Sequence, residues 1–201
     1  MARQPKDGPA SGAWQWGRTA QTQRALLDAA RQVFTEYGFS DSSIADIVQR
    51  AGSSVGSLYH HFGGKSELFF VLWQEHQLAG QEAADQAVAE AREQGVTYQG
   101  QLFEAGARAF LRSSWQRRDL ALLFSSGDAP PGFEVARRRR GREWVSQNDS
   151  LPQLSDTPTD RVYVAILTSL IGEGAREVAG ATSRRQAEMI IDAVIQYARR
   201  L

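Results

Sequence analysis

Apolar residues along this chain recur at spacings of three and four positions, the pattern of amphipathic helices. One apolar face, for example, carries Leu26, Ala30, Val33 and Phe34 before a glycine at position 38. Further helical patterns begin near residues 44, 54, 65, 98, 119, 133, 159 and 183. No alternating stretch is bounded by turn residues at hairpin spacing. The sequence therefore predicts an all-α protein.

The most informative stretch spans residues 42–65 and reads SSIADIVQRAGSSVGSLYHHFGGK. A serine pair at 42–43 can cap one short helix, and a pair at 53–54 can cap a second. Gly52 lies where the chain must bend between them, and the glycines at 63–64 end the second helix. Two helices of about two turns joined by a glycine turn predict a helix-turn-helix.

The second of these helices has only a narrow apolar stripe, formed by Leu58 and Phe62. The residues around the stripe are small or hydrogen-bonding, namely Ser54, Val55, Ser57, Tyr59, His60 and His61. Such a surface suits entry into a DNA major groove, where hydroxyls, imidazoles and methyl groups meet base edges. Lys65 opens the following helix, so its ammonium and nearby backbone N–H groups can meet one phosphate.

At these residues the chain strongly resembles the tetracycline-repressor (TetR) family of transcriptional regulators. The resemblance is carried by the serine and isoleucine at 43–44, by AGSSVGSLYHHF at 51–62, and by Lys65 and Leu68. It covers roughly residues 20–70 at the level of motifs. The remainder of the chain is similar to the family in length and helical character.

The resemblance implies a three-helix DNA-binding domain with a helix-turn-helix, followed by a larger helical domain for ligand binding and dimerisation. We expect an N-terminal arm at 1–17, the DNA-binding domain at 18–64 and the second domain at 65–201. A homodimer would place two recognition helices about one turn of DNA apart (roughly 34–36 Å), on a palindromic operator. A small-molecule effector would release this repressor, and neither enzymatic activity nor a cofactor is implied.

Residue by residue, the resemblance implies contacts with the DNA backbone at Ser43, Tyr59 and Lys65. It implies groove-facing contacts at a second set: Ser54, Val55, Gly56, Ser57, His60 and His61.

Two short motifs typical of enzymes occur in the same stretch, but the sequence around them lacks what each motif requires. Residues 52–56 form a literal G-x-S-x-G, but a nucleophile elbow needs a preceding strand and a later acid and histidine. A helical pattern precedes this one, and no histidine follows His76. Residues 64–66 resemble the end of a P-loop, but Tyr59 occupies the position of its first glycine.

Composition fits an ordinary globular chain of 201 residues, with 42% hydrophobic and 23% charged residues. The net charge is zero, so DNA binding has to rest on placed contacts more than on a broad basic field. Cysteine is absent, which excludes a disulfide framework and a thiolate metal site. No apolar run approaches a membrane span, no signal-peptide core follows Met1, and no metal site is expected. We therefore expect a soluble, cytoplasmic protein.

Residues 1–17 are rich in glycine and proline and are interpreted as a mobile arm. Trp14 and Trp16 are unusual in such a tail. They can pack against the first helix or a neighbour, or the arm can reach along DNA with Arg3 and Lys6.

The last two helical patterns, about 159–180 and 183–201, carry more apolar surface than one small core requires. Gly172 would also let another helix approach closely. In the TetR family these helices pair with those of a second subunit, which implies an interface at Val162, Ile166, Leu167, Leu170, Met189, Ile190, Val194 and Tyr197. The alternative is burial within one subunit.

Aromatic residues lie on several helical segments of the second domain, with polar groups near them. They are core residues or the lining of an effector cavity, and the effector hypothesis comprises Phe103, Phe110, Ser114, Trp115, Phe124, Arg140, Trp144 and Tyr163. Such a cavity favours a mostly apolar small molecule with a polar or anionic end.

The arginine run at 137–140 cannot share one solvent face, because successive helical residues point about 100° apart. Either the run forms a mixed exposed and salt-bridged surface, or one or two arginines turn inward to an anionic effector or a carboxylate.

A different class of protein is also compatible with this sequence. An all-α ligand-binding or scaffold protein with a vestigial helix-turn-helix would show no specific DNA binding at any salt concentration.

Overall fold

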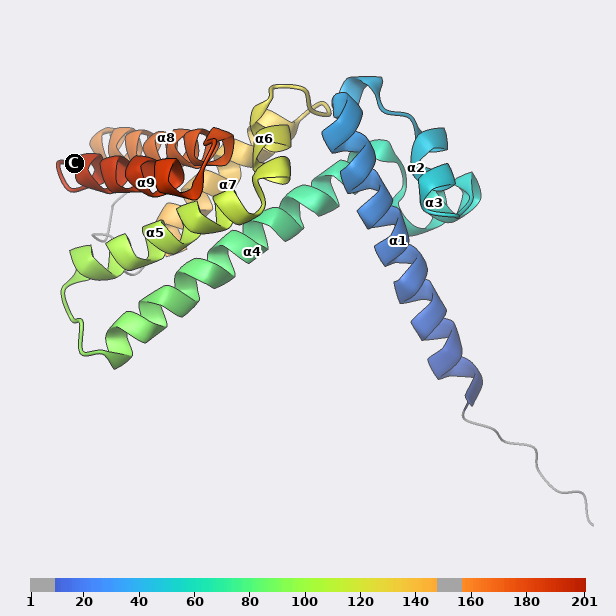
Figure 1. The fold of residues 1–201 in the computed structure, drawn as a ribbon, viewed down its shortest axis with the longest axis horizontal. Coiled ribbons are helices and arrows are strands. Elements are labelled where there is room, and N and C mark those ends of the chain that lie inside the picture. The colour runs from blue at the N-terminus through green and yellow to red at the C-terminus, as the bar shows by residue number, and fades with distance from the viewer. Residues whose placement is uncertain (1–9, 148–156) are drawn as a thin grey trace, which may run out of the picture. The chain divides into compact units, whose positions relative to one another are not determined.

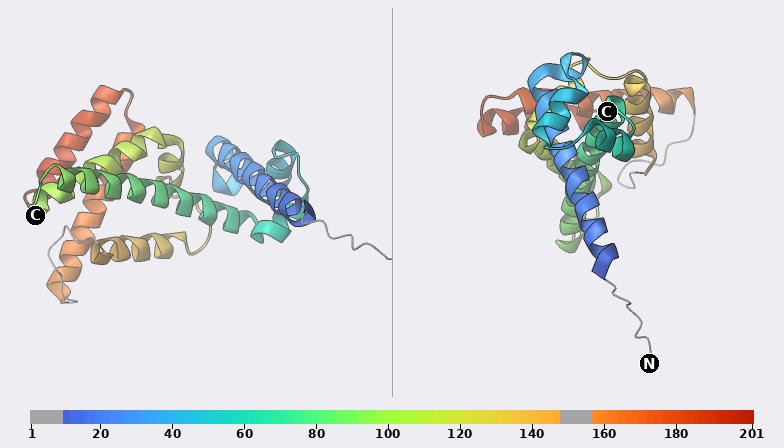
Figure 2. Two further views of the ribbon diagram at one scale, coloured as in Figure 1. Left: turned by 90° about the horizontal axis from the view of Figure 1, so that it is seen from below. Right: turned by 90° about the vertical axis from the view of Figure 1, so that its right-hand side faces the viewer.

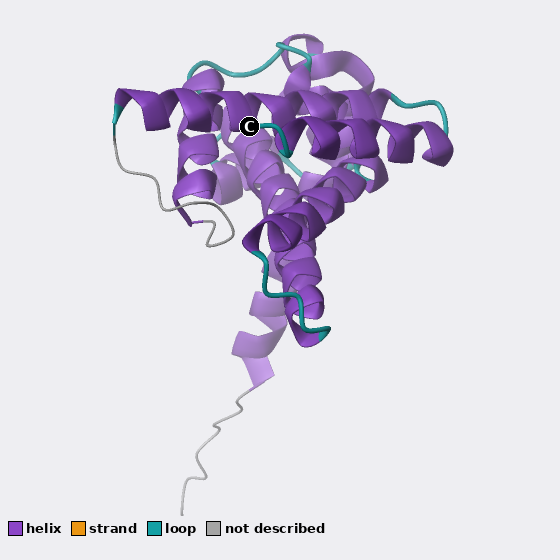
Figure 3. Cartoon of the chain, turned by 90° about the vertical axis from the view of Figure 1, so that its left-hand side faces the viewer, coloured by secondary structure: helices purple, strands orange, loops and turns teal. Residues whose placement is uncertain are grey.

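The computed structural model describes residues 10–147 and 157–201, and every regular element in them is a helix (Figure 3). The helices, drawn in Figure 1, are α1 (Ala10–Asp41), α2 (Ile44–Arg50), α3 (Val55–Phe62), α4 (Lys65–Glu93), α5 (Gln99–Gln116), α6 (Arg118–Ser125), α7 (Phe133–Gln147), α8 (Pro158–Gly180) and α9 (Arg184–Ala198). The expectation of an all-α fold is confirmed for these residues.

The chain divides into two compact units, Met1–Phe69 and Phe70–Leu201. The predicted boundary at Lys65 lies slightly before this division, because α4 begins in the first unit and continues in the second.

Helix α1 begins at Ala10, earlier than the sequence suggested. The expected arm, 1–17, is therefore corrected for its last residues, while residues 1–9 lie outside the described ones. A single glycine costs a helix only about 1 kcal/mol relative to alanine, so Gly12 and Gly17 do not terminate it. Gly38, with φ 80° and ψ 177°, breaks the helical geometry near the other end.

The core of the first unit is built around three phenyl rings, from α1 before its break at Gly38, from α1 after that break, and from α4. The ring centroids of Phe34 and Phe69 are 5.7 Å apart, and Phe39 lies 5.9 and 5.3 Å from them. Ile47 of α2 and Leu58 of α3 are fully buried in the same unit. The two short helices are thus held by one or two apolar side chains each, which leaves their other faces open.

In the second unit, α8 and α9 lie side by side and pack on α5 (Figures 1 and 2). Their shared core contains Leu111 of α5, Leu167 and Ile171 of α8, and Ile191 and Ile195 of α9. Gly174 permits close contact here, since a Cβ at this position would lie 2.7 Å from the Val194 side chain.

A second cluster joins α4, α6 and α7. The Phe133 ring at the start of α7 lies 5.3 Å from Trp73 of α4 and 6.1 Å from Phe124 of α6. His76 of α4 lies 5.5 Å from the Phe124 ring.

Ion pairs connect α5 to α9 beside the apolar core. Arg112 donates two hydrogen bonds of 2.9 Å to Glu188, and Arg108 lies 2.6 Å from Asp192. Further along, Arg199 is paired with Glu104. Hydrogen bonds from Arg112 and Arg199 lower the pKa values of Glu188 and Glu104, respectively.

These lowered pKa values predict a loss of stability in acid. A carboxylate with a depressed folded-state pKa stabilises the fold above its unfolded value, near 4.5, and this stabilisation disappears as the pH falls through the folded value. Glu188→Gln should therefore lower the free energy of unfolding at pH 7 by up to about 1 kcal/mol and have less effect at pH 3. Urea unfolding at several pH values measures the difference.

Glu173→Gln is the control, since Glu173 pairs with Arg176 one turn away within α8. A cost of Glu188→Gln that is the same at pH 7 and pH 3 would contradict a role for the interhelical pair.

Candidate nucleic-acid interface

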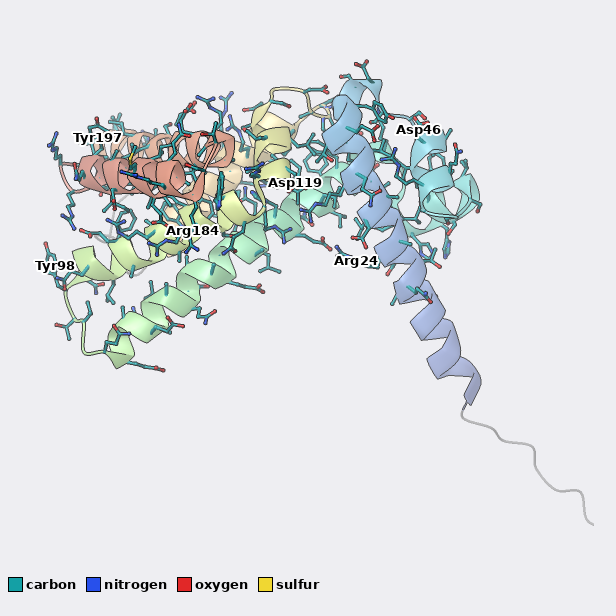
Figure 4. The ribbon with its side chains drawn as sticks, viewed as in Figure 1. Arg24, Asp46, Tyr98, Asp119, Arg184 and Tyr197 are labelled. Atoms are coloured by element: carbon teal, nitrogen blue, oxygen red, sulfur yellow. The ribbon has the colours of Figure 1, made fainter. Side chains whose placement is uncertain are left out.

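Helix α2 begins at a serine cap that the sequence had left between two candidates. Ser43 is the N-cap: its hydroxyl accepts a 3.1 Å hydrogen bond from the backbone N–H of Asp46. The same hydroxyl donates to the Asp46 carboxylate at 2.5 Å. Asp46, labelled in Figure 4, lies in the first turn of α2, where its negative charge interacts favourably with the helix dipole. Ser42 instead is buried and donates to the carbonyl of Phe39.

The turn between α2 and α3 depends on the backbone of Gly52. This residue has φ +59°, and an added Cβ would meet nothing within 4 Å. Glycine is therefore required for its conformation rather than for space. The N–H of Ser53 then donates to the carbonyl of Val48 at 2.9 Å, which closes the turn.

Helix α3 is fixed at both ends and by one buried side chain. Ser54 caps it by accepting a 3.2 Å hydrogen bond from the N–H of Ser57. Gly63 ends it in the left-handed conformation, with φ 88° and its N–H donating to the Tyr59 carbonyl at 3.0 Å. Leu58 is fully buried, whereas Phe62 is half-buried.

The residues predicted to face DNA form the outer surface of this helix. Val55 is 47% exposed and Tyr59 is 52% exposed, which is high for apolar and aromatic side chains. Ser54, Gly56 and His60 are also exposed, while Ser57 and His61 are half-buried. The fold therefore gathers the predicted groove-facing residues on one short helix whose buried anchor points the other way.

Lys65, which the resemblance assigned to the DNA backbone, is the first residue of α4. Its ammonium donates to the carbonyls of Phe39 and Ser42 at 2.7 and 2.8 Å, and Ser40 O lies 3.5 Å away. The ammonium also lies 4.4 Å from the centroid of the Phe39 ring. The structure thus gives this charge partners inside the unit.

Sequence reasoning missed an ion pair that ties α2 to α1. Arg50 donates to Glu36 at 2.8 Å. Hydrogen bonds from Tyr37 and then Arg50 lower the pKa of Glu36, and the bond to Glu36 raises the pKa of Tyr37. These residues are separated by a loop, so no helical spacing could have paired them.

The residues predicted for the dimer interface separate into three groups by burial. Leu167 and Val194 are 1% and 6% exposed within one subunit, so these two are corrected from interface to core. Leu170 and Ile190 are half-buried against that core. Four remain exposed at 47–59%, namely Val162 and Ile166 on α8 and Met189 and Tyr197 on α9.

Most of the residues predicted for the effector site lie in or against the core of the second unit. Phe103, Phe110, Trp115, Trp144 and Tyr163 belong to or pack against the α5–α8–α9 core. Phe124 contacts Phe133, and the hydroxyl of buried Ser114 donates to the Phe110 carbonyl. Aromatic residues at helical spacing here fill the core, because that is where their apolar area is removed from water.

A pocket of about 500 Å³ lies between α4 and α7. It is lined by Val71, Trp73, Gln74, Glu75, Gln77, Leu78, Ala136, Arg139, Arg140 and Glu143. Arg140 alone comes from the predicted effector set, and it donates a hydrogen bond to Gln81 of α4. Six of the ten lining side chains are polar or charged, so this pocket is more polar than expected.

The arginine run is partly salt-bridged. Arg137 pairs with Glu134 at 2.8 Å, and Arg139 and Arg140 lie 3.7 and 3.9 Å from Glu143. Within the described residues, no group of three His, Cys, Asp or Glu side chains could hold a metal. No helix in the same ranges has the length and apolarity to cross a bilayer.

Capped α2, the glycine turn and capped α3 with an open outer face are the geometry of a DNA-binding helix-turn-helix. The comparisons agree with this class. The family model described as "Bacterial regulatory proteins, tetR family" matches residues 26–72. Residues 26–72 are thus similar to the DNA-binding segment of TetR-family regulators.

Curated relatives match over a short stretch of the chain. The "HTH-type transcriptional repressor Rv1474c" of Mycobacterium tuberculosis is 41% identical over 56 residues, 28% of this chain and 30% of that protein. The "HTH-type transcriptional regulator AcrR" of Shigella flexneri is 37% identical over 54 residues, 27% of this chain and 25% of that one. The matched segment thus spans less than a third of either relative.

Solved structures extend the likeness to the second unit at the level of fold. A TetR-like transcriptional regulator from Rhodococcus sp. RHA1 has a TM-score of 0.63 and 23% identity, covering 89% of this chain and 94% of that one. The fatty acid degradation regulator FadR from Bacillus halodurans has a TM-score of 0.60 and 16% identity, with 87% and 96% covered. RolR in complex with resorcinol has a TM-score of 0.53 and 16% identity, with 90% and 89% covered.

Proposed function

We propose that this chain is a sequence-specific DNA-binding transcriptional regulator that acts in the cytoplasm as a repressor. The observation that carries the proposal is the exposed outer face of α3, which a buried Leu58 and two capped ends hold in a fixed orientation. The family model that matches residues 26–72 describes bacterial regulatory proteins, and the curated relatives that match over 54–56 residues are named as a transcriptional repressor and a regulator, which supports the same activity here.

The exposed residues divide by chemistry. We assign base reading in the major groove to Ser54, Val55, Gly56, Ser57, His60 and His61. Ser43 and Tyr59 carry hydroxyls suited to phosphate oxygens, and such contacts set register without reading sequence. Lys65 is left out of the phosphate contacts, because its ammonium is hydrogen-bonded within the unit.

The dimer is proposed to form through the outer faces of α8 and α9. Val162 and Ile166 lie four residues apart on α8, and Met189 and Tyr197 lie eight apart on α9, so each pair shares one helical face. Tyr197, labelled in Figure 4, is 57% exposed. At Gly172 an added Cβ would meet nothing within 4 Å, which leaves room for a close helix. A twofold arrangement of these faces would present two α3 helices to a palindromic operator.

The effector site is proposed at the pocket between α4 and α7. Trp73, Val71 and Leu78 offer apolar surface, while Arg140 and Gln77 offer polar groups. This lining favours an amphipathic small molecule, in place of the mostly apolar one that the aromatic residues suggested. The fold relative RolR binds the small phenol resorcinol, which supports a ligand of this size. Because α4 belongs to both units, a ligand that favours one position of α4 can favour a dimer that does not bind DNA.

Selection of bound sites from a random DNA pool tests the proposed function. We expect an inverted repeat whose half-sites lie about one helical turn apart. His60→Ala should change the preferred base at one position, because a lost base contact removes about 1–3 kcal/mol of discrimination. Tyr59→Phe should weaken binding to all sequences by about 1 kcal/mol, because it removes one hydrogen bond to phosphate.

Leu122→Ala is a matched control, since Leu122 is exposed on α6 in the other unit. Recovery of no sequence by the wild-type chain at low salt would refute the function and favour a ligand-binding or scaffold protein.

Met189→Glu should dissociate the dimer and abolish tight operator binding. Met189 is 59% exposed in one subunit, so the charge is tolerated in the folded chain but would be buried without a partner in the dimer, at a cost of several kcal/mol. Sedimentation velocity measures the mass, and circular dichroism checks the fold. Val135→Glu, at a residue 70% exposed on α7, should remain dimeric. A stable Met189→Glu dimer would place the interface elsewhere.

Ala136→Trp should make the repressor insensitive to its effector. The indole would fill the α4–α7 pocket and block a compound that quenches tryptophan fluorescence and releases the wild type from operator DNA. Val135→Trp is the matched control, because Val135 is the exposed neighbouring residue. Normal release of the Ala136→Trp protein by such a compound would show that induction uses another site.

A further inference from the structure

Lys65 is held by residues 39–42, which form the end of α1 after its break at Gly38 and the start of the link to α2. Its ammonium has three N–H donors, and the carbonyls of Phe39 and Ser42 accept from it at 2.7 and 2.8 Å. Ser40 O is at 3.5 Å, and the Phe39 ring centroid at 4.4 Å. All of these groups belong to the four residues between the Gly38 break and the Ser43 cap. Two of the three donors are thus used in short hydrogen bonds, and a phosphate would compete with the longer contact to Ser40 O.

The carbonyls need such a donor because of where they lie. Gly38, with ψ 177°, breaks the helical geometry of α1 just before Phe39, and Ser42 lies between α1 and α2, so both carbonyls stand at irregular backbone. A buried or half-buried carbonyl there needs a donor from elsewhere in the fold. Phe39 O accepts from both the Ser42 hydroxyl, at 2.7 Å, and Lys65. Charge-assisted hydrogen bonds of this kind are about twice as strong as neutral ones.

The Lys65 side chain therefore links the start of α4 to the end of α1 and to the residue before the α2 cap. Lys65 is the first residue of α4, two residues after the Gly63 cap that ends α3. Its acceptor Ser42 immediately precedes Ser43, which caps α2. Beneath the ammonium, the Phe39 ring packs at 5.3 Å on Phe69, one turn further along α4.

We propose that Lys65 is a positioning residue, which fixes the 39–42 segment on the first turn of α4 and thereby orients Ser43 and α2 for DNA binding. This inference rests on the proposed function. It assigns the lysine a different role from the phosphate contact that the sequence suggested.

The two roles differ in the salt dependence of operator binding. A lysine that neutralises one phosphate contributes about 0.9 to the slope of log affinity against log salt concentration. Lys65→Met keeps an unbranched side chain and loses the charge and the donors. We expect the folded Lys65→Met protein to bind operator roughly tenfold more weakly at every salt concentration, with the wild-type slope. Circular dichroism establishes that the variant is folded, and hydrogen exchange should be faster in residues 39–48 than in the wild type, with no change in residues 24–34.

Lys65→Arg is a second, independent test of the two roles, and it can still distinguish them if Lys65→Met does not fold. Arginine keeps the charge and binds phosphate at least as well as lysine. The phosphate role therefore predicts full affinity for Lys65→Arg. The positioning role predicts weaker binding, because the planar guanidinium cannot direct its donors to Phe39 O and Ser42 O as the ammonium does.

A Lys65→Met slope lowered by about one, wild-type affinity of Lys65→Met, or wild-type affinity of Lys65→Arg would each overturn the proposal. Failure of the wild-type chain to select any sequence would instead refute the proposed function.

Discussion

The first unit depends on the docking of two helices that are too short to be stable alone. Helices α2 and α3 have 7 and 8 residues, and isolated helices below about 12–15 residues are marginal in water. They persist because Ile47 and Leu58 are fully buried in a core that also holds Phe34 and Phe69. The glycine turn and the two serine caps then satisfy the backbone groups that such short helices leave unpaired. One anchored face on α3 leaves the opposite face open, and this open face is the candidate reading surface.

In the second unit, α8 and α9 each have one buried face and one exposed face that carries apolar residues. One side of α8 and α9 is buried against α5, with Leu167 and Ile191 nearly or fully inaccessible. On the other side, Val162, Ile166 and Met189 remain exposed. Ion pairs between α5 and α9 fix how these helices pack within the subunit. A rigid pair with a second apolar face is what a dimer of helical subunits requires, and this supports the proposed interface.

The position of an effector site depends on where a cavity forms, and not on where aromatic residues occur. Phe103, Phe110 and Tyr163 contribute to packing, and the pocket lies where α7 carries arginines and α4 carries glutamines. Burial of aromatic area stabilises a core whether or not a ligand exists. A space between two helices arises only when their side chains fail to fill it, and a sequence pattern does not reveal this.

The sequence by itself determined the helical class, the helix-turn-helix and the surface of α3, because these depend on local spacing, caps and glycines within about 24 residues. Only the tertiary structure decided the roles of residues that meet across loops. Leu167 and Val194 share a helical face pattern with their exposed neighbours, and burial against α5 alone separates core from candidate interface. Lys65 precedes an ordinary helix in the sequence, yet the fold brings it to carbonyls more than twenty residues earlier in the chain. Such contacts are set by how helices pack, and helix packing depends on the whole core rather than on any one segment.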